Sequence, residues 1–186
     1  MFNIKHIIKQ FPLCSLITIF IIAELVINPI GNFPLNDDWW YAHLYKQLFE
    51  QKTPNTLVWA STSLWGQLFL TKLYSFVFGC SYTALRFFTL ILSASSILLF
   101  YNLCIKYFNL KWSLAFLMNL LLIFNPLFLC LSNSYMTDVP FLFFILGGIY
   151  FFFLFQEKKQ WFHFILSLVF FVFAILTRQV TLAFLI

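Results

Sequence analysis

The segment at residues 139–155, VPFLFFILGGIYFFFLF, decides the fold class, because it contains no charged side chain and does not alternate between apolar and polar residues. The hydrocarbon core of a bilayer is about 30 Å thick, and a helix needs about 20 apolar residues to cross it. A membrane strand would instead alternate between the two kinds of residue. Four more continuous apolar stretches lie at residues 11–30, 82–103, 113–131 and 161–180. We therefore predict an all-α integral membrane protein with about five transmembrane helices.

The composition excludes a water-soluble domain. Hydrophobic residues make up 62% of the chain and charged residues 9%, whereas a soluble domain carries about 25% charged residues. The net charge is +5, but the basic residues are spread over the ends of the apolar stretches, and we expect no nucleic-acid partner. The four cysteines are far apart and show no CxxC spacing, which predicts neither a zinc site nor a disulfide framework. A divalent cation is conceivable at His43 and Asp38 but has no further support, so we predict no metal and no cofactor.

The lysines set the expected orientation. Cytoplasmic loops are enriched in Lys and Arg, and short loops follow this bias best. The N-terminal segment and two short links between apolar stretches carry lysines, namely Lys5, Lys9, Lys106, Lys111, Lys158 and Lys159. We expect these segments inside, and the long loop 31–79 and the hairpin 132–138 outside.

Two adjacent carboxylates, Asp37 and Asp38, come soon after the first apolar stretch. Such a pair can act as a general base or hold a cation. It can also belong to the first turn of a helix, where the helix dipole favours acidic residues and Asn36 would be the cap. Leucines and aromatic residues that recur every four positions predict an amphipathic helix over about residues 38–50, lying in the membrane interface. Both interpretations of the carboxylates stay open at this point.

Three more charged residues, Arg86, Asp138 and Arg178, lie at the expected outer ends of apolar stretches. Charges in membrane spans mostly face the interior of a helix bundle and mark function, and a guanidinium can bind phosphate through its planar set of donors. The alternatives are that Asp138 caps its helix and that the arginines extend toward the membrane surface. Glu24 lies inside the first stretch, where it either bonds to a neighbouring helix or lines a cavity.

Four segments together resemble the GT-C glycosyltransferases, and most closely glycosyltransferase family 39, which includes protein O-mannosyltransferases and bacterial aminoarabinose lipid A transferases. The segments are residues 34–42, 83–86, 133–141 and 176–179. Their order, spacing and expected membrane side match the family over nearly the whole chain. Many relatives have Lys where this chain has Arg178, and their acidic pair is Asp-Glu rather than Asp-Asp. The resemblance implies that residues 1–186 form the N-terminal transmembrane region of a GT-C bundle, with interfacial helices in its first outer loop.

The resemblance also implies an activity. It is the transfer of one sugar from a polyprenyl-phosphate donor to a hydroxyl of a glycan, lipid or protein, with inversion, on the outer face of a bacterial inner membrane. Asp37 would be the general base, while Asp38 and Asp138 would orient that base or contact the sugar. Arg178 and Arg86 would bind the donor phosphate and offset its growing charge.

Two other interpretations of the sequence remain open. In a fragment of a transporter or flippase, Glu24, Arg86 and Arg178 would form a polar pathway, and a helix broken at Gly147-Gly148 would be expected near mid-membrane. In an inactive truncated remnant, the helices would carry no chemistry. The apolar C-terminal sequence, residues 181–186, leads us to expect a part of a longer protein.

Overall fold

The computed structural model describes residues 4–35, 37–47 and 64–180, and within these ranges it is all-helical. The helices are α1 (Ile4–Ile27), α2 (Asp38–Lys46), α3 (Trp65–Phe78), α4 (Tyr82–Asn102), α5 (Trp112–Ile123), α6 (Pro126–Ser132), α7 (Asp138–Lys158) and α8 (Trp161–Thr177), and α4 continues into a π-helical turn at Leu103–Tyr107. The prediction of an all-α fold is confirmed.

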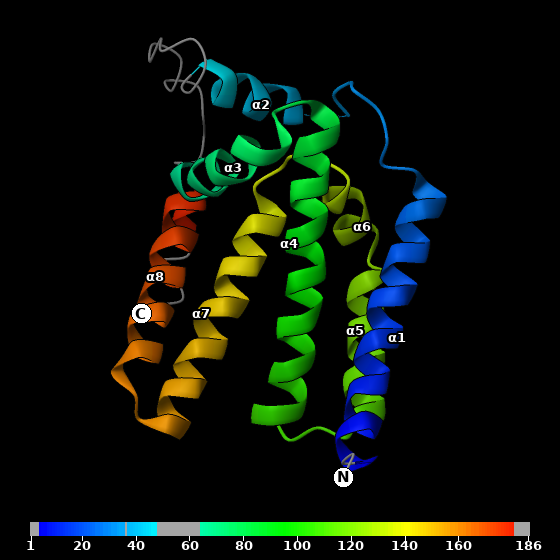
Figure 1. Cartoon of the computed structure of the whole chain (residues 1–186), viewed down its shortest axis with the longest axis vertical. Coiled ribbons are helices and arrows are strands. Elements are labelled where there is room, and N and C mark those ends of the chain that lie inside the picture. Colours follow the sequence, from blue (N-terminus) through cyan, green and yellow to red (C-terminus); the bar gives the residue numbers. More distant parts are fainter. Residues whose placement is uncertain (1–3, 36, 48–63, 181–186) are drawn as a thin grey trace.

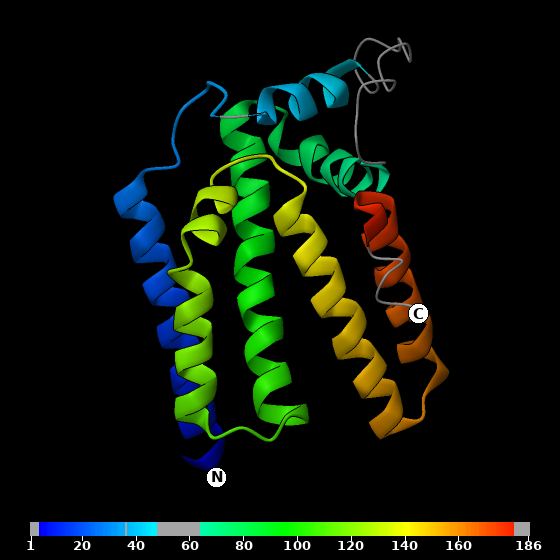
Figure 2. The ribbon, with the colours of Figure 1, turned by 180° about the vertical axis from the view of Figure 1, so that it is seen from behind.

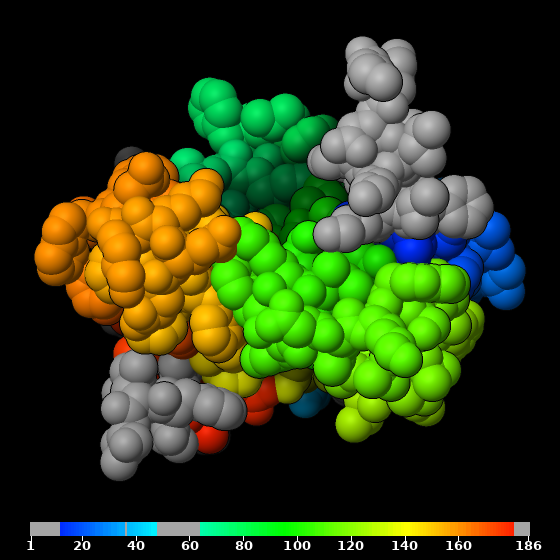
Figure 3. Space-filling view, turned by 90° about the horizontal axis from the view of Figure 1, so that it is seen from below, coloured from blue at the N-terminus to red at the C-terminus, as the bar shows by residue number. Residues whose placement is uncertain are grey.

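The long helices form a bundle, and α2 and α3 lie across one of its ends, here called the α2–α3 end (Figure 1). Seen from behind, α4 stands between a group made of α1 and α5 and a group made of α7 and α8 (Figure 2). The strongest packing joins α7 to α8 and α4 to α7, while α1 packs on α5. Figure 3 looks onto the opposite end, where the α4–α5 and α7–α8 links adjoin. There the Tyr107 and Phe153 rings stack with centroids 5.1 Å apart.

Two described helical segments, Tyr82–Tyr107 and Asp138–Lys158, are each long and apolar enough to cross a bilayer. The pair Trp112–Ile123 and Pro126–Ser132 makes a third if its two helices count as one span, and Pro12–Ile27 and Trp161–Thr177 are apolar but shorter. Each predicted stretch thus coincides with a helix or with the bent pair. The chain is a multi-pass integral membrane protein, and the number five remains a prediction.

The stretch predicted as one helix over residues 113–131 is divided by a bend of 63°. The cause is Asn125-Pro126. The proline ring disfavours helical geometry at the residue before it, and Pro126 itself is well suited to the first turn of a new helix. The Asn125 side chain caps that new helix, accepting from the backbone N–H of Leu127 at 2.9 Å and of Phe128 at 3.3 Å.

The glycine pair in α7 does not break the helix, which is continuous over Asp138–Lys158. Gly147 instead faces the ring of Phe170, and a Cβ at Gly148 would lie 2.9 Å from the ring of Phe171. The Ser167 hydroxyl donates to the Gly148 carbonyl at 2.8 Å. The two glycines therefore admit aromatic rings of α8, and the break expected of a transporter is absent from α7.

The described part of the predicted outer loop, residues 31–35, 37–47 and 64–79, contains two helices. The predicted helix over residues 38–50 corresponds to α2, and its last part, residues 48–50, lies outside the described residues. α3 was not predicted individually; it buries Gln67, Leu68 and Thr71, while large apolar side chains such as Phe76 remain exposed. At Gly66 the helix approaches α8 so closely that a Cβ would overlap the Phe173 carbonyl and the Thr177 hydroxyl.

Candidate active site

α2 is held in place by a short buried face. Ala42 packs in a cluster with Leu85 of α4 and Tyr135 of the hairpin before α7. Leu44 and Tyr45 pack with Leu68 of α3. These contacts fix the orientation of the helix, and therefore of the two acidic residues at its start.

The two adjacent carboxylates have different surroundings. Asp38 is 1% exposed, and its Oδ1 accepts from the backbone N–H of Leu35 at 3.0 Å. Asp37 occupies the N-cap position of α2, makes no side-chain capping bond there and is exposed. Asp38 therefore holds the chain that enters α2, whereas Asp37 presents its carboxylate at the surface. The predicted cap, Asn36, lies outside the described residues.

Asp138 and Arg178 form an ion pair at the α2–α3 end, between Oδ1 and Nη1. Asp138 is the first residue of α7, where the helix dipole favours an anion, and Arg178 directly follows α8. The Arg178 guanidinium also lies over the ring of Phe141, with its central carbon 5.9 Å from the ring centroid. Both side chains remain about one third exposed, so the pair is accessible.

Tyr41 is subject to the charges of Asp37 and of both members of this ion pair. Burial raises the pKa of Tyr41, the charges of Asp37 and Asp138 raise this pKa further, and the charge of Arg178 opposes them. All three charges are therefore close enough to act on one phenol group. Tyr41 was not predicted as a site residue, although it follows Asp37 by four positions and so falls on the same face of α2.

The hairpin that carries Asp138 is anchored to α3. The hydroxyls of Thr71 and Tyr135 share a hydrogen bond of 2.7 Å in a buried environment. Burial raises the pKa of Tyr135, so this phenol stays neutral. The anchor fixes α3 relative to the start of α7.

Arg86 lies elsewhere, buried beneath the loop that follows α1. Arg86 is 2% exposed, and its guanidinium donates to the carbonyls of Pro29 at 3.3 Å, Gly31 at 2.9 Å and Phe33. Its predicted contact with the donor phosphate is untested, but these contacts differ from those of the accessible Arg178.

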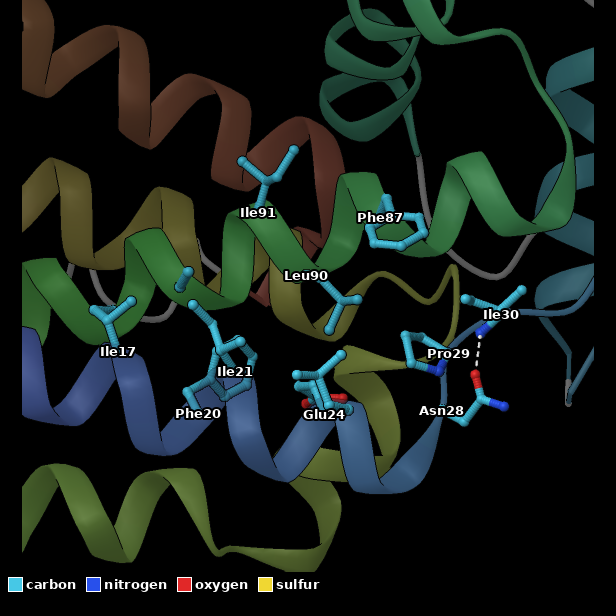
Figure 4. A pocket seen from close by; sticks show the side chains of 12 residues that line it. Ile17, Phe20, Ile21, Glu24, Asn28, Pro29, Ile30, Phe87, Leu90 and Ile91 are labelled. Atoms are coloured by element: carbon cyan, nitrogen blue, oxygen red, sulfur yellow. Dashed lines mark hydrogen bonds between the residues drawn. The ribbon is translucent and has the colours of Figure 1, made fainter.

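Glu24 lines a cavity of about 290 Å³ between α1 and α4 (Figure 4). Its Oε2 accepts from the Asn133 side chain at 2.6 Å, which joins α1 to the hairpin before α7. The surrounding walls are apolar, with Phe20, Phe87 and Leu90 among them. Both alternatives left open for Glu24 are thus correct, since it bonds to a neighbouring segment and also lines a cavity.

Within the described ranges, no three His, Cys, Asp or Glu side chains are grouped as metal ligands would be. His43 is exposed, and its ring lies 5.9 Å from that of Trp40. The expectation of no metal and no cofactor stays a prediction.

These features define a class: a multi-pass helical membrane protein with Asp37, Asp138 and Arg178 gathered at one end of its bundle. The family model described as dolichyl-phosphate-mannose-protein mannosyltransferase matches residues 62–186, about two thirds of the chain, and the chain belongs to this family of GT-C glycosyltransferases. The matched part includes Arg86, Asp138 and Arg178, and Asp37 and Asp38 precede it. Comparisons with curated proteins and with solved structures give no significant match.

Proposed function

We propose that this protein moves a single sugar from a polyprenyl-phosphate carrier to an acceptor hydroxyl, with the reaction taking place at the α2–α3 end of the bundle. The observation that carries the proposal is the accessible ion pair of Asp138 and Arg178 at the same end of the bundle as the exposed carboxylate of Asp37 (Figure 1). A family described by dolichyl-phosphate-mannose supports a lipid-borne donor of the same chemical class. The acceptor is a hydroxyl of a glycan, a lipid or a protein.

Asp37 is the proposed general base. Asp37 is exposed, whereas Asp38 is buried and its Oδ1 already accepts from the Leu35 N–H. Asp37 is therefore the carboxylate that an acceptor can reach. The Asp37 carboxylate takes the proton of the acceptor hydroxyl while the hydroxyl oxygen attacks the anomeric carbon of the sugar. The bond from that carbon to the phosphate oxygen breaks, and its electron pair leaves with the lipid phosphate. A single displacement of this kind inverts the configuration of the sugar.

Arg178 is the proposed phosphate contact. A guanidinium has five N–H donors in a planar arrangement that suits phosphate oxygens, and the Asp138 Oδ1 contact uses the Nη1 group. Positive charge beside the leaving phosphate stabilises the charge that grows there in the transition state. Asp138 holds the guanidinium in position, and Asp38 holds the entry to α2, so both acids act through a neighbour in this proposal.

The lysine distribution supports a location of this end on the outer side of the membrane, which would be the inner membrane of a bacterium. The reaction then draws on a donor that has already crossed the bilayer, and no nucleotide-sugar site is needed.

The test determines which class of donor the protein uses. Membranes that contain the protein expressed from its complete reading frame are incubated with a radiolabelled polyprenyl-phosphate sugar or with the corresponding nucleotide sugar. We expect label to enter an acceptor only from the lipid donor, and Glu157→Gln, at the far end of α7, to leave transfer unchanged. Movement of the labelled lipid across vesicles without transfer would support a transporter instead, and neither activity would indicate an inactive protein.

A further inference from the structure

The loop at residues 28–35, which joins α1 to the acidic start of α2, is tied to α4 by a buried arginine. Arg86 donates to the carbonyls of Pro29, Gly31 and Phe33, and the Phe33 ring centroid lies 4.9 Å from the central carbon of its guanidinium. Three carbonyls from alternate positions of one loop thus converge on one side chain. A planar guanidinium can serve several acceptors at once, whereas a lysine ammonium is a compact charge with three donors.

Two further contacts hold the same loop. The Asn32 side chain accepts from the backbone N–H of Tyr82 at 3.0 Å, which satisfies a free donor at the start of α4. At the other end of the loop, the Leu35 N–H donates to Asp38 at 3.0 Å. The loop is therefore bound to α4 through Arg86 and Tyr82, and to α2 through Asp38.

The environment of Arg86 argues against a direct contact with the donor. Arg86 is 2% exposed, and a buried charge needs hydrogen-bond partners; here backbone carbonyls accept from its Nη1 and Nη2 groups, while its Nε has no partner among the described residues. A phosphate would have to displace those carbonyls and open the loop. Arg178 is about one third exposed, so a phosphate can approach its guanidinium from the surface.

We propose that Arg86 is a positioning residue for Asp37: by holding the carbonyls of Pro29, Gly31 and Phe33, it fixes the loop that delivers Asp37 to the Asp138–Arg178 pair. This inference rests on the proposed role of Asp37 as the base. It assigns Arg86 to the placement of the base, in place of the predicted contact with the donor phosphate. A displacement of about 1 Å in a reacting group can cost about 100-fold in rate, so loss of the guanidinium affects turnover even though Arg86 touches no substrate.

The first test is a cycle of Arg86→Met, Asp37→Asn and the double variant, assayed by transfer from the radiolabelled polyprenyl-phosphate sugar. We expect Arg86→Met to lower kcat by about 10- to 100-fold with the donor KM changed by less than about threefold. In the Asp37→Asn background the same substitution should cost less than about twofold, because there is no base left to position. Arg86→Lys should fall between wild type and Arg86→Met, and it serves as the test variant if Arg86→Met does not accumulate. Lys111→Met, an exposed charge deletion at the other end of the bundle, is the control.

Three outcomes would overturn the inference. A donor KM raised at unchanged kcat would make Arg86 a donor ligand. If the losses in transfer of the two single variants multiply in the double variant, Arg86 acts independently of Asp37. Normal transfer by Asp37→Asn would remove the proposed base and with it this role, and that result is distinguishable because it appears in the single variant.

The second test measures the loop without any activity. Amide hydrogen exchange of the segment 29–38 should be about tenfold faster or more in Arg86→Met than in wild type, because the loop loses its charged hydrogen bonds. The segment around Ser167, within the α7–α8 contact, should exchange as in wild type. Unchanged exchange in the loop would contradict the positioning role.

Discussion

Asp138 and Arg178 are 40 positions apart in the sequence and form an ion pair that joins the start of α7 to the residue following α8. A second ion pair, between Lys106 and Glu157 at 2.6 Å, lies near the opposite end of α7. The two pairs differ in their neighbours: the first lies beside Tyr41 and the charge of Asp37, and the second beside Tyr107. Comparing substitutions in the two ion pairs therefore distinguishes a contribution to stability from a contribution to the reaction.

The first prediction concerns Asp138→Asn. Accessible ion pairs contribute about 0–1 kcal/mol to stability, so thermal unfolding of the purified protein in detergent should change little. Transfer should nevertheless fall by at least about tenfold, because a misplaced guanidinium no longer meets the leaving phosphate. Glu157→Gln is the matched control and should change neither the thermal unfolding nor the transfer rate. If Asp138→Asn and Glu157→Gln have the same transfer rate, the Asp138–Arg178 pair has only a structural role.

The second prediction concerns orientation and rests on the lysine distribution. Single cysteines are placed at Leu35 and at Asn109, both exposed, in a background without the four native cysteines. An impermeant thiol reagent applied to intact cells should label the first position, and the second only after the membrane is permeabilised. Labelling of Asn109→Cys alone in intact cells would reverse the assigned sides and place the candidate site inside.

The third prediction concerns Gly66→Ala. Alanine favours a helix over glycine by up to about 1 kcal/mol, but here its methyl group would meet the Phe173 carbonyl and the Thr177 hydroxyl. Overpacking of this kind costs about 1–3 kcal/mol, so we expect a lower unfolding temperature. Because Thr177 directly precedes Arg178, transfer should fall as well. Leu73→Ala, on the exposed side of α3, should lower neither the unfolding temperature nor transfer. Equal stability of Gly66→Ala and wild type would show that α3 can move away from α8.

The sequence was sufficient for the fold class and for the end of the bundle at which the charges gather. Continuous apolar stretches predict helices because no polar backbone can face lipid unpaired. Asp138 begins one stretch and Arg178 ends the next, so two antiparallel neighbours bring them to the same end. Their direct contact could not be predicted, because it depends on the packing of α7 against α8.

Other features depend on contacts between distant segments and have no sequence signature of their own. The adjacent acids Asp37 and Asp38 look equivalent in the sequence, but Asp38 is buried and accepts from the Leu35 N–H, whereas Asp37 is exposed. Arg86 appears as one more arginine at the outer end of a span, and its partners are backbone carbonyls, which any sequence provides. The bend at Asn125-Pro126, in contrast, carries a local signal that a reading based on hydropathy alone overlooks.

The most direct test of the proposed mechanism compares Asp37→Asn and Arg178→Ala in two measurements on the same membranes: transfer from a radiolabelled polyprenyl-phosphate sugar, and equilibrium binding of that donor. General-base catalysis contributes about 10²–10⁴-fold, so Asp37→Asn should lose transfer by that order while donor binding survives. Arg178→Ala should weaken both, because the phosphate contact exists before and during the reaction. Near-normal transfer by Asp37→Asn would contradict the account and make Asp38 the next candidate for the base.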